Sequence, residues 1–155
     1  MITLALDLAG TTGYGIEYDT GEVKAGLWIL TRGNLGGRRS PIPMLRLWHR
    51  LNRLGSTHQI DRVVYEETFG RGDAKNRLDS LQHCTTLWCL LNQIPFIRAS
   101  PSEWKKAVLG TGRANRQEYH AAAIQRFPSV DVWKDDIAAA LWLLTYAKRF
   151  DPIAD

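Results

Sequence analysis

Cysteine is scarce in this chain of 155 residues, which contains only Cys84 and Cys89. Both fall within one expected helix, and their offset of five residues turns them to different faces, which excludes a disulfide between them. A chain without a disulfide framework is typical of a reducing compartment, so we expect a cytoplasmic protein. The four histidines are scattered and form no zinc-type pattern with the cysteines.

Long apolar runs are also missing. No stretch approaches the ~20 apolar residues that a membrane helix needs. The opening segment MITLALDLAG has no basic region and carries Asp7 inside its apolar run. This pattern argues against a signal peptide and favours a first strand. Because internal repeats, low-complexity tracts and linkers are absent too, we expect one domain over residues 1–155, with no membrane association.

The charge that is present is distributed unevenly. The net charge is +4, yet residues 32–77 hold ten Lys or Arg against four Asp or Glu, while residues 1–31 are acidic on balance. A basic middle beside an acidic edge suits a polyanionic partner together with a cation site. Ordinary solubility charge is the alternative interpretation.

Hydrophobic periodicity and turn signals divide the chain into strands and helices. Short turns join the first three strands, which should be antiparallel, whereas the later strands alternate with helices and should be parallel. We therefore predict an α/β fold with a mixed five-stranded sheet flanked by helices. The expected strands are 2–8, 12–18, 22–30, 62–67 and 95–98, and the expected helices are 43–54 (ending at Gly55), 74–93, 101–109, 115–127 and 135–149.

Acidic side chains end two of these strands and begin the last helix. Asp7 interrupts an apolar strand, where a charge is costly unless it is compensated. Glu66 and Glu67 point to opposite faces of their strand, so only one of them can join Asp7, and periodicity alone leaves open which one. Asp135 and Asp136 stand in the first turn of the last helix. Each acid also has a structural interpretation, as a turn acceptor, a solvent-facing residue or a helix cap.

Carboxylates gathered in a basic chain indicate chemistry on phosphates. Hard cations such as Mg²⁺ prefer oxygen ligands and keep waters and substrate phosphates in their coordination sphere. Two such ions about 4 Å apart can activate a water and stabilise the leaving oxygen in phosphodiester cleavage. The pattern therefore favours a metal-dependent nuclease.

Several segments resemble the RuvC family of Holliday-junction resolvases, over nearly the whole chain. Asp7 with the following TTGYGI is similar to the family's first motif, and Glu66 matches a Glu that ends a family strand. Phe69 matches an aromatic wedge, and residues 104–116 (WKKAVLGTGRANR) are similar to a basic region. Asp136 begins a segment similar to the closing D-x-x-D-A-L motif.

This resemblance implies an RNase H-like fold and an endonuclease that resolves Holliday junctions or other branched DNA in recombination and repair. It implies catalysis by Asp7, Glu66 and Asp136, which would bind Mg²⁺, or Mn²⁺ in its place, with Asp135 as a further ligand. The residues expected to bind DNA are Phe69, Arg71, Lys75, Arg77, Lys105, Lys106, Arg113 and Arg116.

The chain departs from the family at Ala139, where the closing motif has its second Asp. Either Asp135 or Glu67 compensates, or metal binding is impaired. A catalytically impaired protein that only binds branched DNA is therefore one alternative function. The other is a YqgF-like nuclease of RNA processing, which shares the fold and the first Asp. Actin-like ATPases need two such domains, and this chain has room for one.

Resolving a junction of near two-fold symmetry takes two symmetric cuts, so one site per chain implies a homodimer. The expected interface is the 74–93 helix, whose apolar positions exceed what one core-facing stripe requires. Burial of the whole helix within the monomer is the alternative. The apolar positions are Leu78, Leu81, Leu87, Trp88, Leu90 and Leu91.

Overall fold

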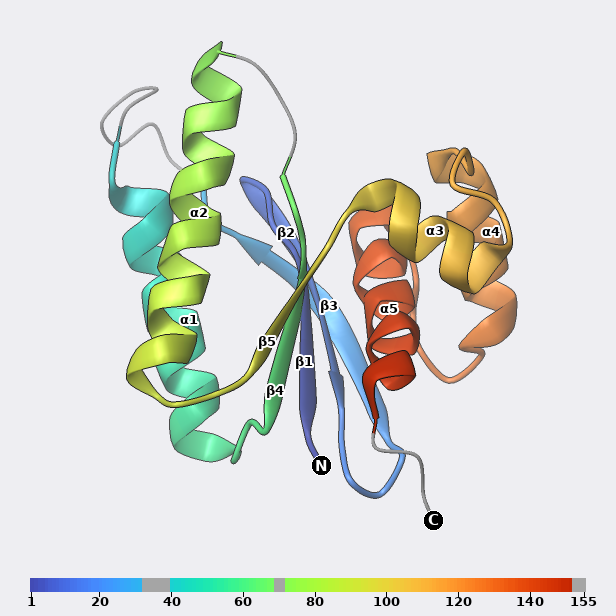
Figure 1. Ribbon diagram of the computed structural model, residues 1–155, viewed down its shortest axis with the longest axis horizontal. Helices are drawn as coiled ribbons and strands as arrows, with labels where there is room; N and C mark the ends of the chain where they lie inside the picture. Colours follow the sequence, from blue (N-terminus) through green and yellow to red (C-terminus); the bar gives the residue numbers. More distant parts are fainter. Residues whose placement is uncertain (32–39, 69–71, 152–155) are drawn as a thin grey trace.

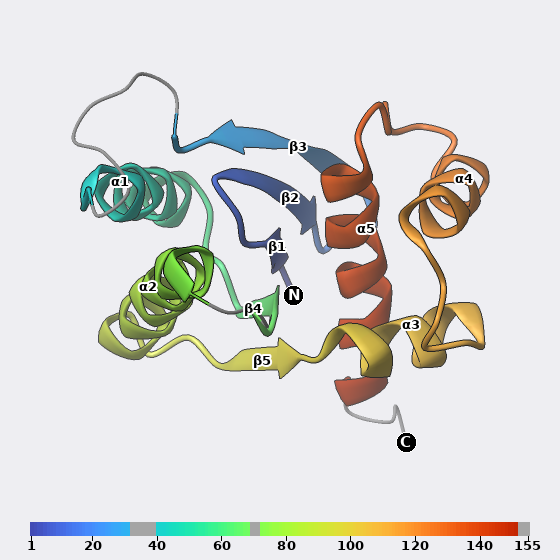
Figure 2. The same cartoon turned by 90° about the horizontal axis from the view of Figure 1, so that it is seen from above.

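A single mixed sheet lies between two layers of helices (Figures 1 and 2). The computed structural model describes residues 1–31, 40–68 and 72–151. The strand order is β3-β2-β1-β4-β5, which confirms the predicted α/β class and the five-stranded mixed sheet. Along the chain the elements are β1 (Thr3–Asp7), β2 (Thr11–Glu17), β3 (Val23–Ile29), α1 (Ile42–Thr57), β4 (Arg62–Glu66), α2 (Gly72–Leu91), β5 (Phe96–Ala99), α3 (Pro101–Leu109), α4 (Arg116–Arg126), α5 (Asp135–Ala147) and the short 3-10 helix η1 (Lys148–Phe150).

Strand directions follow from the connections. β1, β2 and β3 pair antiparallel, whereas β1 with β4 and β4 with β5 pair parallel. Both pairings agree with the sequence prediction. Because β1 and β4 run the same way, the residues that end them lie at the same edge of the sheet.

One face of the sheet packs against α1 and α2. Leu4 and Leu6 of β1 and Val63 and Tyr65 of β4 alternate onto this face and are fully buried there. Every second residue of these strands points to this face, which is the ordinary side-chain alternation of a strand. The same alternation sends Ala5 of β1 to the opposite face.

The opposite face packs against α5, with α3 and α4 outside it (Figure 2). Every residue of α5 from 137 to 144 is buried. Small residues make this possible, because Gly13 and Gly15 of β2 leave no side chain between the strand and the helix. The backbone of α5 therefore approaches the sheet closely enough to bring its N-terminus beside the end of β1.

The predicted end of α1 at Gly55 is wrong. The helix continues to Thr57, and His58 is its C-cap. A Cβ on residue 55 would lie 2.9 Å from Cζ2 of Trp88 in α2, so Gly55 allows α1 and α2 to approach rather than ending the helix. The remaining boundaries differ from the predictions by at most two residues, and such differences are usual at element ends.

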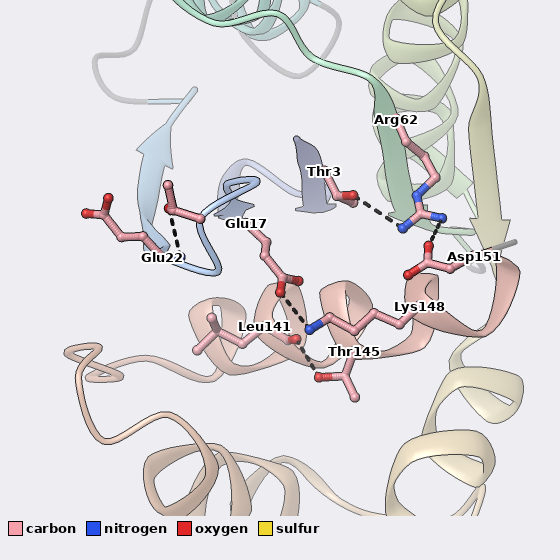
Figure 3. Close-up of polar contacts among 9 residues, drawn as sticks. Thr3, Glu17, Glu22, Arg62, Leu141, Thr145, Lys148 and Asp151 are labelled. Atoms are coloured by element: carbon pink, nitrogen blue, oxygen red, sulfur yellow. Dashed lines mark hydrogen bonds and ion pairs between the residues drawn. The ribbon is translucent and has the colours of Figure 1, made fainter. Parts of the chain in front are cut away.

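A polar cluster closes the edge of the sheet where β1 and β4 begin (Figure 3). Arg62 is buried and donates from Nη1 to Oδ1 of Asp151 at 2.7 Å and from Nη2 to Oγ1 of Thr3 at 3.3 Å. Lys148 pairs with Glu17 at 2.6 Å. These contacts tie the end of the described chain to β1, β2 and β4. No helix among the described residues is both long and apolar enough to cross a membrane.

Candidate active site

Two carboxylates lie side by side at the opposite edge of the sheet. The parallel register pairs Leu6 of β1 with Tyr65 of β4, so Asp7 and Glu66 are the next residues of adjacent strands. Asp7 and Glu66 each stand two residues after Ala5 and Val64, which face α5, so they lie on the same face of the sheet. Alternation therefore makes Glu66 the neighbour of Asp7, and this settles the choice that strand periodicity alone left open.

Glu67 belongs to the other side of the sheet. Its backbone N–H donates to the carbonyl of Ala99 at 2.8 Å, which continues the pairing of β4 with β5. Its charge contributes to the raised pKa of Tyr65, which lies on the α1–α2 face and whose pKa is raised chiefly by burial. Glu67 is thus an unsuitable substitute for the carboxylate missing at Ala139.

The third carboxylate comes from the first turn of α5. Asp7 lies opposite Gly13 in the pairing of β1 with β2. The backbone of Asp136 occupies the space where a side chain on Gly13 would be. Asp136 is therefore placed beside Asp7, although almost the whole chain separates them in sequence.

Electrostatics confirm that these acids interact. Burial raises the pKa of Asp7 well above its usual value, and the charges of Glu66, Asp136 and Asp135 raise it further, in that order. Burial also raises the pKa of Glu66 and of Asp136, and Asp135 adds to the rise at Asp136. Crowded carboxylates of this kind are stabilised by a cation.

One cation is supplied by the chain itself. Nε of Arg116 lies 3.5 Å from Oδ2 of Asp135, and the guanidinium lowers the pKa of Asp7, Glu66 and Asp136. The Arg116 side chain is 83% exposed, so it remains accessible to a polyanion from solution. Asp135, in contrast, is already engaged by a cation.

The donor set fits a hard metal ion. Asp7, Glu66 and Asp136 offer only oxygen ligands, and their mutual repulsion is the condition that a divalent cation relieves. In residues 1–31, 40–68 and 72–151, no three His, Cys, Asp or Glu side chains are already grouped tightly enough to hold one ion. Side-chain rotation would thus have to complete the coordination.

Ala139 lies one turn after Asp136 on α5 and is 2% exposed. It packs in the core that α5 forms with Ala5 and Val64, on the same face as the carboxylates. This position therefore provides a methyl group close to the site and no ligand.

Sequence reasoning missed two aromatic residues of the site. Trp104 of α3 is fully buried, and its Nε1 donates to Oε2 of Glu66 at 2.6 Å. The ring of Tyr119 in α4 meets it edge-on, with centroids 5.6 Å apart. Burial and then the charge of Asp7 raise the pKa of Tyr119.

A sequence signal for these aromatics existed. Ser100 and Asn115 are N-caps of complete capping boxes, with Glu103 and Glu118 as their partners. The next residue in each helix is the large aromatic, which is the position that often packs inward at a helix start.

The basic residues predicted to bind DNA divide by position. Lys105 acts on the charge of Glu66, and Arg116 acts on all three carboxylates. Lys106 instead lines a hollow with Tyr146 and Arg149, away from Asp7. Arg113 is exposed in the turn between α3 and α4.

The other predicted DNA-binding residues belong to the segment after β4. Lys75 pairs with Asp79 at 3.9 Å on α2. Arg77 lines a pocket between the starts of α1 and α2. Both lie in the first turns of α2, at the end of the molecule where β4 finishes (Figure 1). Phe69 and Arg71 lie outside the described residues.

Comparison with known proteins identifies the fold. No family model and no curated protein matches the sequence. Among solved structures, Thermus thermophilus RuvC matches with a TM-score of 0.71 and 17% identity over 96% of each chain. The same protein in complex with a Holliday junction substrate matches with a TM-score of 0.74 and 14% identity, again over 96% of each chain.

A viral protein shows the same likeness. The fowlpox virus resolvase in complex with substrate Holliday junction DNA matches with a TM-score of 0.63 and 16% identity, over 98% of this chain and 100% of that one. These structures show that the chain has the fold of RuvC-type resolvases, as the sequence resemblance implied.

Proposed function

We propose that this chain is a metal-dependent endonuclease that cuts branched DNA, in particular four-way junctions. The observation that carries the proposal is the convergence of Asp7, Glu66 and Asp136 at one edge of the sheet. Three separate elements supply these acids, and the pKa of Asp7 is raised first by burial and then by the charges of Glu66 and Asp136. Proteins of the same fold have been solved with junction DNA.

The three carboxylates would hold Mg²⁺, for which Mn²⁺ can substitute, with Asp135 at the margin of the site. When bound, the metal lowers the pKa of an attacking water and stabilises charge on the phosphodiester oxygens. Arg116 and Lys105 lie beside the acids, where each can contact a phosphate of the strand to be cut. Trp104 and Tyr119 fill the floor of the site and exclude bulk water from one side of Glu66.

Adjacent glutamates provide a matched test. Glu66→Gln and Glu67→Gln remove the same charge on opposite faces of one strand end. With a synthetic four-way junction and Mg²⁺, we expect Glu66→Gln to lose at least about 100-fold in cleavage rate, because even the outer partners of metal ligands cost 10–100-fold. Glu67→Gln should cut at nearly the rate of the unmodified protein. Equal cleavage by both variants would contradict the assignment.

Because Ala139 provides no metal ligand, a second candidate function is a protein that binds branched DNA without cutting it. The two functions differ in a single measurement, since both give a shifted band with junction DNA in EDTA and only the nuclease yields nicked strands in Mg²⁺. The same junction made of RNA tests the YqgF-like alternative. If the RNA junction is cut in preference to the DNA junction, RNA would be the substrate instead of DNA.

We further propose a homodimer, through α2. Leu87, Leu90 and Leu91 are 51%, 62% and 65% exposed and form one solvent-facing stripe on its last turns. Leu81 and Trp88 instead form the core-facing stripe of α2, because both are buried in the core shared with α1. Leu78 is half-buried.

Both cysteines are free, and burial raises the thiol pKa of Cys84 to about 11 and of Cys89 to about 12. We propose a cytoplasmic location, since neither cysteine is in a disulfide, as is usual in a reducing compartment.

A further inference from the structure

The indole of Trp104 makes a short hydrogen bond to a carboxylate of the candidate metal site. The Nε1–Oε2 distance to Glu66 is 2.6 Å, and the tryptophan is fully buried. A buried indole N–H needs an acceptor, and here the acceptor is an acid rather than a backbone carbonyl. The bond opposes the effect of burial on the pKa of Glu66, so it favours the charged carboxylate.

The same indole also contacts the lysine beside it. Nζ of Lys105 lies 5.5 Å from the ring centroid of Trp104 and 5.3 Å from that of Tyr119. An ammonium over two aromatic faces is attracted by both ring quadrupoles. Its charge acts on Glu66 as well. The aromatic pair therefore contacts both the carboxylate of Glu66 and the ammonium group of Lys105.

We infer that Trp104 is a positioning residue with two functions. Its N–H holds Oε2 of Glu66 and would leave Oε1 available to the metal that the proposed function requires. Its ring face, with that of Tyr119, holds Lys105, which would contact a phosphate of the bound DNA. Hydrogen bonds to metal ligands fix the ligand's orientation and raise metal affinity. The inference rests on the proposed function, because it presupposes that Glu66 is a metal ligand.

A second buried tryptophan supplies the control. Trp88 is 1% exposed, and its Nε1 donates to Oδ1 of Asn52 at 2.9 Å on the other side of the sheet. Trp104→Phe and Trp88→Phe both remove one buried indole N–H and keep an aromatic ring. Any general loss of packing should therefore be similar in the two variants.

The first readout is Mn²⁺ binding without DNA, followed through the EPR signal of the free ion. We expect Trp104→Phe to weaken Mn²⁺ binding by about 10–100-fold, and Trp88→Phe to leave it within about twofold. Thermal unfolding of both variants in EDTA reports any common structural loss. Equal Mn²⁺ affinities for the two variants would overturn the inference that the indole N–H orients Glu66.

The second readout is the salt dependence of junction binding in EDTA. Trp104→Phe keeps a ring face under Lys105, whereas Trp104→Leu removes it. We expect Trp104→Leu to reduce the log–log slope by about one, the value for one lost phosphate contact, and Trp104→Phe to leave the slope unchanged. If Trp104→Leu is unstable, a reduced slope for Trp104→Phe alone would overturn the function assigned to the ring face.

Failure of this inference differs from failure of the proposed function. If the unmodified protein and Asp7→Asn bind Mn²⁺ equally weakly, there is no metal site and both proposals fall. If Asp7→Asn abolishes binding while Trp104→Phe binds as the unmodified protein does, the metal site stands and the positioning role of Trp104 alone is lost.

Discussion

Gly13 and Asp136 are in such close contact that a Cβ atom on the glycine would overlap the backbone carbonyl of the aspartate. Gly13 is the β2 partner of Asp7, so this contact sets how near α5 comes to the end of β1. Because Gly13 has no side chain, α5 can approach β2 closely enough to place Asp136 beside Asp7.

Gly13→Ala should displace the start of α5. Overpacking of a core costs about 1–3 kcal/mol or more, and backbone is less able to yield than a side chain. Gly15→Ala is the milder comparison, because its Cβ would come closest to the end of the Leu144 side chain, at 3.0 Å, and would lie in ordinary contact with the Ala140 carbonyl, at 3.6 Å. We expect a larger fall in Tm for Gly13→Ala, together with loss of Mn²⁺ binding. Unchanged metal affinity in a folded Gly13→Ala variant would show that the contact does not set the site.

Asp7→Asn should stabilise the metal-free protein near neutral pH. The folded-state pKa of Asp7 lies above its ordinary value of 3.8, so its favourable contribution is complete below that value and is lost as pH rises through the folded pKa. At pH 7, well above the ordinary pKa, an Asp with a raised folded-state pKa destabilises the fold, and Asn removes that cost. Since 1 kcal/mol shifts Tm by roughly 2–4 °C in a chain of this size, we expect a rise of that order in EDTA.

Two comparisons control the Asp7→Asn experiment. The gain in Tm should shrink as the pH approaches 4, where the carboxyl is increasingly protonated in both states. Added Mg²⁺ should raise the Tm of the unmodified protein more than that of Asp7→Asn, because a ligand that binds the folded state stabilises it. A variant that is less stable than the unmodified protein at pH 7 in EDTA would contradict the cause assigned to the pKa shift.

Ala139→Asp should restore a fourth carboxylate and lower the Mg²⁺ concentration needed for half-maximal junction cleavage. The position is 2% exposed, so the substitution should also destabilise the protein in EDTA. Ala139→Asn imposes nearly the same shape without the charge and should reproduce only the loss of stability. An identical Mg²⁺ titration for all three proteins would place residue 139 outside the metal site.

Lys105 and Arg116 should supply two phosphate contacts. Their double substitution to Ala should flatten the log–log salt dependence of junction binding by about two on the duplex scale. Lys106 and Arg149 line a hollow on another part of the surface, so their double substitution loses the same charge elsewhere. If both double variants had the same log–log slope as the unmodified protein, none of the four residues would contact a DNA phosphate.

Leu90→Glu with Leu91→Glu should convert a dimer into a monomer, as measured by light scattering after size exclusion. Ile124 of α4 is 53% exposed, and Ile124→Glu provides an exposed apolar residue outside α2 as control. A protein that is strictly monomeric, free and on junction DNA, would exclude symmetric double cutting and favour a single-nick branch nuclease.

Much of the architecture could be predicted from the sequence, because period-two and helical patterns carry over directly into strands and helices. The parallel direction of the later strands also followed from the order of elements. The pairing of β1 with β4, which brings Asp7 and Glu66 together, came from the structure. Gly55 was misjudged since a glycine's role depends on what approaches it, and here the neighbour is Trp88, a residue of another helix.

The choice between Glu66 and Glu67 needed the structure, because alternation defines two faces without saying which one α5 covers. Trp104 was missed for a different reason. The capping box at Ser100 indicates that Trp104 packs inward, but it does not indicate that the indole reaches Glu66 in β4. Which leucines of α2 are exposed depends on which face of α2 packs against α1. A helix with apolar residues on several faces does not show this in its sequence.

The cover that α5 provides for β1 and β2 dictates an order of events during synthesis. The three antiparallel strands precede α5 in the chain and can pair locally, but one face of their sheet stays uncovered until α5 has left the ribosome. Asp7 and Glu66 are likewise synthesised before Asp136. Until α5 has emerged and packed, the nascent chain therefore holds two of the three carboxylates, and the cluster cannot form.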